Sequence, residues 1–144
     1  MPGNTDPIYS RIGDVSKDGT TGMGQLITAA ANDYTGIGAN NVLVWTADAT
    51  NGGFLQRVRL KAGGTNVASV MRFFINNGAT NATATNNSFY GELSLPATTL
   101  SASAATVDLD YTFNIALPAG FRIYAGLGTA VAAGWAMTPI AGKY

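Results

Sequence analysis

The feature that most constrains the fold of this chain is a repeated alternation of short apolar segments with turn-forming residues. In residues 109–117 every odd residue is apolar and every even residue is small or polar. This period of two is typical of a strand with one buried and one solvated face. Turns rich in Gly, Asn or Pro separate the segments. Eight segments follow the pattern: 25–31, 41–47, 54–62, 67–76, 88–95, 109–117, 121–129 and 134–140.

Eight short strands with no helical periodicity predict an all-β fold, an antiparallel β-sandwich of jelly-roll type. The chain has 144 residues, the usual size of one domain. We expect an extended N-terminal arm over residues 1–22, where Pro2 and Pro7 favour extended backbone, and the sandwich over residues 23–144. We also expect a hairpin at Gly63-Gly64, a meander of the last three strands, and at most one helical turn, in residues 102–107.

The composition narrows the function. Charged residues make up 11% of the chain and histidine and cysteine are absent, so thiol chemistry, a Ser-His-Asp triad and histidine-based zinc sites are excluded. We therefore expect no enzyme, no catalytic residues, no cofactor and no metal. The eight basic and eight acidic residues give a net charge of zero, so we expect no electrostatic attraction to nucleic acid. The sequence contains no apolar run of about 18 residues and no signal-peptide pattern, so we expect neither a membrane-spanning nor a secreted protein.

A basic face is the first candidate for a partner interface. Arg57, Arg59 and Lys61 alternate along one predicted strand, and Arg72 falls nearly opposite Arg57 if Gly63-Gly64 makes a hairpin. Like charges across a strand pair repel. One interpretation is that acidic groups of another subunit offset them, with Asp14 and Asp18 of a neighbour's arm as candidates. The other is that they are ordinary solubilising charges.

Two aromatic residues and two acidic patterns complete the candidates. Phe74 and Tyr90 are predicted to point away from the core, as interface anchors or sugar-stacking groups. The run from Asp14 to Gly19 partly matches a calcium loop, but the carboxylate expected at its twelfth position is Gln25, so an acidic turn is the favoured interpretation. Asp108 and Asp110 share one side of a strand and are read as a solvated strand start rather than a catalytic pair.

Several segments together resemble small virion proteins of tailed bacteriophages. The resemblance spans residues 25–144. It rests on the following runs: Asn41-Val-Leu-Val-Trp45-Thr-Ala, Arg57-Val-Arg-Leu-Lys61, residues 64–77, Leu95-Pro-Ala-Thr, Leu117-Pro-Ala-Gly-Phe and the closing residues 134–142.

The resemblance implies a capsid decoration or cement protein, made in the host bacterial cytoplasm. Such a protein binds the major capsid protein on the outer capsid surface, usually as a homotrimer, and clamps neighbouring capsomers. An alternative is a tail-fibre or receptor-binding domain that contacts glycans, although fibre proteins usually add a long repetitive shaft. A small carbohydrate-active enzyme would need paired carboxylates, which the sequence does not show.

Overall fold

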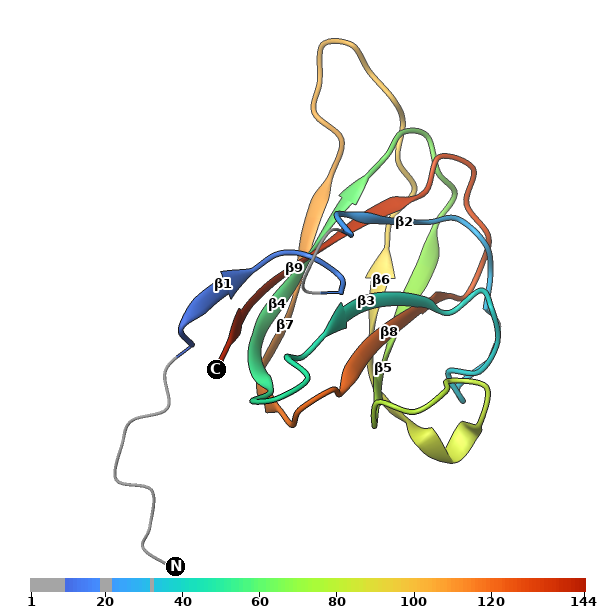
Figure 1. Ribbon diagram of the computed structural model, residues 1–144. Coiled ribbons are helices and arrows are strands. Elements are labelled where there is room, and N and C mark those ends of the chain that lie inside the picture. The colour runs from blue at the N-terminus through green and yellow to red at the C-terminus, as the bar shows by residue number, and fades with distance from the viewer. Residues whose placement is uncertain (1–9, 19–21, 32) are drawn as a thin grey trace, which may run out of the picture.

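The computed structural model describes residues 10–18, 22–31 and 33–144, which form nine strands in two antiparallel sheets (Figure 1). Sheet A contains β1 (Ile12–Asp14), β2 (Gln25–Ile27), β9 (Trp135–Lys143), β4 (Gly53–Ala62) and β7 (Asp108–Leu117). Sheet B contains β3 (Val42–Thr46), β8 (Arg122–Leu127), β5 (Ser69–Asn76) and β6 (Asn87–Leu95). Apart from the short 3₁₀ helix η1 (Ala84–Asn86), the described residues contain no helix.

The strand order is that of a jelly roll. β5 pairs with β6, β4 with β7, β3 with β8 and β2 with β9, as if one long hairpin were wound around the core. The β4–β9 and β5–β8 pairings then join successive turns of the winding into two sheets. The predicted all-β sandwich is confirmed, and each of the eight predicted segments contains a strand.

The core lies between the two sheets and consists of aromatic and branched aliphatic side chains. Trp45, Phe73 and Trp135 are its largest members, and all three are fully buried. They come from β3, β5 and β9, so both sheets contribute. Burial of apolar area between the sheets is the main stabilising term in a fold of this kind, because a sheet can solvate only one of its faces.

Two local expectations are wrong because strands close in sequence alternate between the sheets. β7 and β9 lie in sheet A while β8 lies in sheet B, so the last three strands form no meander. β4 and β5 likewise belong to different sheets, and Gly63-Gly64 carries the chain from one to the other instead of closing a hairpin. Residues 102–107 form no helical turn and lie in the irregular loop between β6 and β7.

A β-bulge changes which residues of β4 face the core. The pairing shifts between Leu55 and Arg57 against both neighbouring strands. Since a bulge inserts one residue into the alternation, Leu55 joins Val58 and Leu60 in the core, with all three fully buried. A strict alternation would place Phe54 on the same side as Val58 and Leu60, but Phe54 is only partly buried.

The segment predicted as an arm contributes a strand to its own sandwich. β1 pairs with β9, and Arg11 N donates to Lys143 O at 2.6 Å. Residues 1–9, which include Pro2 and Pro7, and residues 19–21 lie outside the described residues. In the described part, residues 10–14 therefore run along the edge of sheet A.

Candidate partner interface

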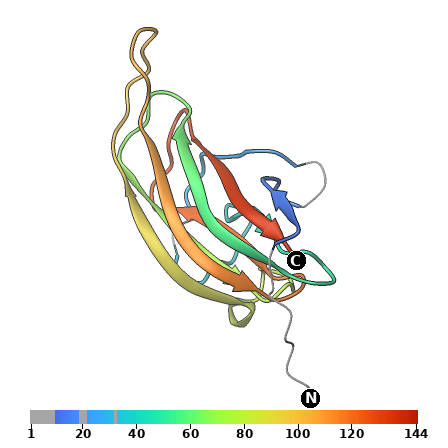
Figure 2. The ribbon, with the colours of Figure 1, turned by 90° about the vertical axis from the view of Figure 1, so that its left-hand side faces the viewer.

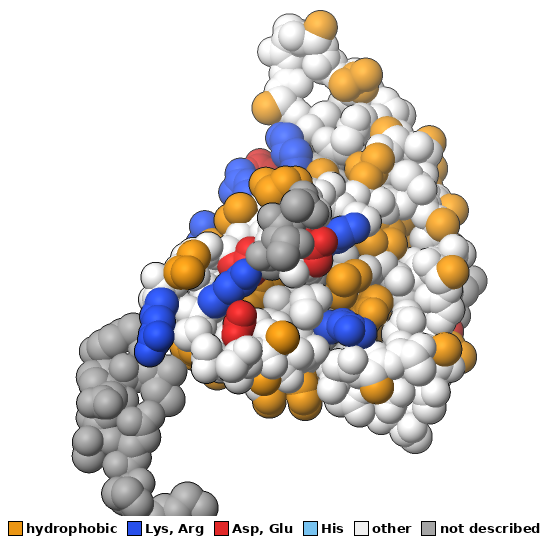
Figure 3. All heavy atoms as spheres, viewed as in Figure 1, with side chains coloured by type: hydrophobic (Ala, Val, Ile, Leu, Met, Phe, Trp, Pro, Cys, Tyr) orange, Lys and Arg blue, Asp and Glu red, His pale blue; other side chains and the backbone are white. Residues whose placement is uncertain are grey.

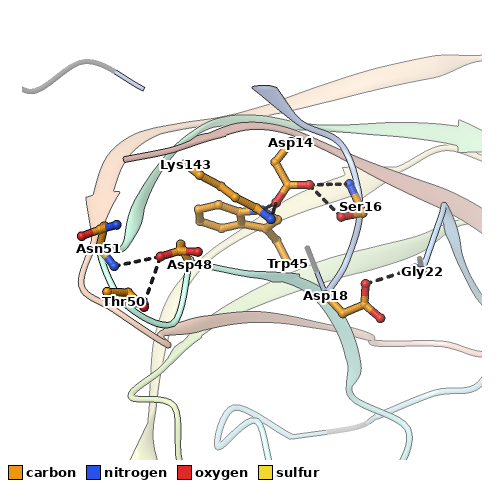
Figure 4. Close-up of polar contacts among 9 residues, drawn as sticks. All are labelled: Asp14, Ser16, Asp18, Gly22, Trp45, Asp48, Thr50, Asn51 and Lys143. Carbon is orange, nitrogen blue, oxygen red and sulfur yellow. Dashed lines mark hydrogen bonds and ion pairs between the residues drawn. The ribbon is translucent and has the colours of Figure 1, made fainter. Parts of the chain in front are cut away.

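Asp14 holds the N-terminal segment onto the core (Figure 4). Its carboxylate accepts hydrogen bonds from the Trp45 indole at 3.0 Å, and from the Ser16 amide at 3.0 Å and hydroxyl at 2.7 Å. Lys143 Nζ lies 3.9 Å away. Asp14 is only 5% exposed, so within one chain its carboxylate is already enclosed, and its role at an interface with a neighbour stays a prediction. The indole of Trp45 needs a buried acceptor, and Asp14 supplies it.

Asp18 lies in a local turn beyond Asp14. One of its carboxylate oxygens accepts the Gly22 amide at 3.0 Å (Figure 4). Gly19, the glycine of the calcium-loop pattern, lies outside the described residues. Within the described parts of the chain, no three acidic side chains come together where a metal ion could be held.

The basic residues of β4 form a charge ladder with acidic residues of β7 on the outer face of sheet A. Arg57 lies 3.4 Å from Asp110, and Arg59 contacts both Asp108 and Asp110. Lys61 donates to the Thr106 carbonyl. The repulsion among these cations is therefore offset within the chain, which removes the reason for expecting an acidic neighbour. The arginine and aspartate side chains are 40–47% exposed, so each pair adds little stability.

Arg72 does not belong to this ladder, and the prediction that it lies opposite Arg57 is wrong. It lies on β5 in sheet B, because the chain crosses between sheets at Gly63-Gly64. Its side chain is 12% exposed and lies 3.5 Å from Glu92 of the paired strand β6. Its guanidinium also lies 4.3 Å from the centre of the Tyr34 ring.

Phe74 points away from the core, as predicted, but it is not an exposed anchor. It is 1% exposed because residues 33–41 cross the outer face of sheet B above it. Gly36, with a φ of 73°, sits so close that a Cβ atom there would lie 2.9 Å from the Phe74 ring. The chain itself therefore covers Phe74, and an interface role for this residue stays a prediction.

Tyr90 is partly exposed, at 38%, where the edge strands β6 and β7 lie side by side (Figure 2). Its ring stacks on Phe113 with centroids 5.0 Å apart and planes 9° apart, and its hydroxyl donates to the Phe113 carbonyl at 3.4 Å. It is the extra residue of a bulge in β6. Tyr90 therefore joins the two sheets at this edge.

Tyr111 of β7 packs against Tyr90 at the same edge, the seam between β6 and β7. The position of its hydroxyl group requires a glycine at position 91. A Cβ atom on Gly91 would overlap the Tyr111 hydroxyl oxygen and lie 3.2 Å from its Cζ. Burial raises the pKa of the Tyr111 phenol, and the nearby Tyr90 adds to the rise.

Replacing Gly91 with Ala is expected to lower the free energy of unfolding by about 1–3 kcal/mol, the usual cost of overpacking. The penalty should shrink in a Tyr111→Phe background, where the clashing oxygen is gone. Urea denaturation of the single and double variants measures the coupling free energy between the changes at positions 91 and 111. Equal penalties in both backgrounds would show that the hydroxyl is not the obstacle.

A projecting loop joins β6 to β7. Residues 96–107 carry no charge and extend beyond the sandwich between β6 and β7 (Figure 1). Leu100 is 67% exposed there. The base is fixed, since Thr98 exchanges two backbone hydrogen bonds with Asn66, at 2.9 and 3.0 Å, and Thr65 accepts the Leu100 amide at 2.9 Å.

Comparison with protein-family models, with curated proteins and with solved structures found no match to this chain. Among the described residues there is no helix long and apolar enough to cross a membrane.

Proposed function

We propose that this protein is a structural virion protein that decorates a tailed-phage capsid. In this role it binds the major capsid protein on the outer capsid surface, associates with other copies of itself as a homotrimer, and stabilises contacts between neighbouring capsomers. It carries out no catalysis. Its jelly roll positions surfaces for assembly.

The observation that carries this proposal is the charge-free loop of residues 96–107. The loop consists of Ala, Ser, Thr, Leu, Pro and Val residues, and the face of it seen in the space-filling view carries no blue or red groups (Figure 3). Leucine and alanine exposed on a projection gain free energy when another surface covers them. The fixed base lowers the entropy lost on docking.

Two further properties support an assembly role. The charged fraction of 11% is well below the roughly 25% of an average domain, and a charge-poor surface favours association. The jelly roll is also a recurrent fold of capsid proteins. Because the same fold serves lectins and enzymes, this likeness supports the proposal only by analogy.

The test is binding to capsid shells of the encoding virus from which this protein has been stripped. The wild-type chain should co-sediment with the shells and raise the temperature at which they release DNA. Leu100→Glu should weaken binding at least about tenfold, because burying a leucine side chain is worth about 1.5–3 kcal/mol.

Ile12→Glu is the matched control. Ile12 is 65% exposed, as Leu100 is, but it lies on β1 at the far end of the sandwich (Figure 1), and this variant should bind normally. Absence of the wild-type protein from the shell pellet would contradict the decoration role. Full binding by Leu100→Glu would contradict the assignment of the loop as the contact.

A further inference from the structure

Tyr34 presents an aromatic ring on the outer face of sheet B. The residue is 57% exposed. The Arg72 guanidinium carbon lies 4.3 Å from the ring centre, and Phe89 meets the ring edge-on with centroids 5.3 Å apart. The ring is therefore supported on the protein side by a cation and a second aromatic group, and its remaining surface is open to solvent.

The backbone around Tyr34 is held in place by side-chain hydrogen bonds. Asp33 Oδ1 accepts the amides of Thr35 at 3.1 Å and Gly36 at 3.2 Å. Asn87 Nδ2 donates to the Thr35 carbonyl at 3.1 Å. Because these bonds fix the turn before any ligand arrives, little backbone entropy would be lost on binding at the ring.

A surface hollow of about 320 Å³ adjoins the guanidinium that supports this ring. Its lining combines apolar surface, from residues such as Ala68 and Val70, with a smaller polar part. Ser69 Oγ donates to the Thr129 carbonyl at 2.8 Å and accepts the Thr129 amide at 3.0 Å, which fixes one wall. The lining residues are Ala68, Ser69, Val70, Arg72, Gly128 and Thr129.

From this arrangement we infer that Tyr34, Arg72 and the adjoining hollow form a binding subsite for a neutral hexopyranose, such as one residue of a surface glycan. The C–H groups on one face of a pyranose ring carry partial positive charge, and an aromatic face is negative, so the sugar stacks on Tyr34. Arg72 donates to the Tyr34 hydroxyl at 3.3 Å and so holds the ring in place. The sugar hydroxyl groups then reach acceptors on Glu92 and polar backbone groups on the walls of the hollow.

The local charges favour a neutral sugar over an anion. Glu92 lies 3.5 Å from Arg72 Nε and balances its charge, and Asp33 adds a further negative group next to Tyr34. Among the described residues, Arg72 is the only cation that lines the hollow. A phosphate or a nucleic-acid strand would therefore gain little electrostatic free energy here.

The test is a titration of the ¹⁵N-labelled chain with the methyl α-D-glycosides of glucose, mannose and galactose. At least one should shift the amide signals of Tyr34, Gly128 and Thr129 in fast exchange, with a Kd of roughly 1–10 mM, typical of a single small ligand of few contacts. Tyr34→Ala should weaken binding at least about tenfold, while Tyr34→Phe, which keeps the ring, should retain it within about threefold.

Tyr90→Ala is the matched control, since it removes a partly exposed tyrosine at the seam between β6 and β7 and should leave binding unchanged. If the amide signals of Thr35 and Gly36 in Tyr34→Ala stay at their wild-type positions, the turn is still folded. If those signals move, Arg72→Gln serves as the test variant instead, and it should also weaken binding. The inference is overturned if none of the three glycosides shifts these amides, or if inorganic phosphate shifts them and the glycosides do not. It does not depend on the decoration role, which the shell assay tests separately.

Discussion

Replacing Asn66 with Ala is expected to lower the free energy of unfolding by about 3 kcal/mol, because one buried and one partly buried backbone amide lose their acceptor. Asn66 is 4% exposed. Its Oδ1 accepts the amides of Ala133 and Gly134, each at 2.9 Å, and its Nδ2 donates to the Gly134 carbonyl at 3.0 Å. Its backbone also pairs with Thr98. Through its side chain and its backbone, this one residue joins the loop between β8 and β9 to the base of the projecting loop.

Urea denaturation followed by tryptophan fluorescence measures this loss. Asn51→Ala is the control, because Asn51 is exposed and its backbone amide, not its side chain, makes the turn hydrogen bond to Asp48. The control should change stability by less than about 0.5 kcal/mol. Hydrogen exchange should also quicken at Gly134 and Thr98 in Asn66→Ala. A variant as stable as wild type would show that water replaces the amide without cost.

Replacing Asp14 with Ala is expected to cost about 2–3 kcal/mol, because hydrogen bonds to charged groups are among the stronger ones and the buried indole N–H is left without an acceptor. Trp45 is fully buried, so its Nε1 has no route to solvent while β1 stays in place. We expect the loss to appear first as faster hydrogen exchange in β1 and in the residues of β9 that pair with it.

A double-mutant cycle with Trp45→Phe separates the hydrogen bond from the packing. Asp14→Ala should cost about 1–2 kcal/mol less in the Trp45→Phe background, where no indole N–H needs an acceptor. The loss should also be the same at low and high protein concentration, because every contact named lies within one chain. A penalty that grows with concentration would place Asp14 at an interface between copies.

The local pattern predicted the strands well because it depends on neighbouring residues. In 109–117 the alternation of apolar and polar residues survives in β7, where Phe113 and Leu117 are buried and the Asp108 and Asp110 side chains face outward. The absence of any helical periodicity likewise matches the scarcity of helix in the described residues. Period and turn chemistry act over a few residues, so one sequence is enough to read them.

The candidate site was predicted less well because it depends on which strands pair. Arg57, Arg59 and Lys61 do share an outer face, but their partners Asp108 and Asp110 are about 50 residues away in the chain and meet them only through the β4–β7 pairing. Phe74 was assigned the correct side of its strand, and only the tertiary crossing of residues 33–41 buries it.

The sequence by itself determined the all-β sandwich and the approximate positions of eight of its strands, since alternation and turn residues act locally. Only the tertiary structure decided the division of strands between sheets, the bulges that bring Leu55 into the core and set Tyr90 at the seam, and the pairing of Asp14 with Trp45. The physical reason is that pairing and burial maximise contact between distant segments, and a bulge or an outer covering loop changes which side chains are exposed without altering the local pattern.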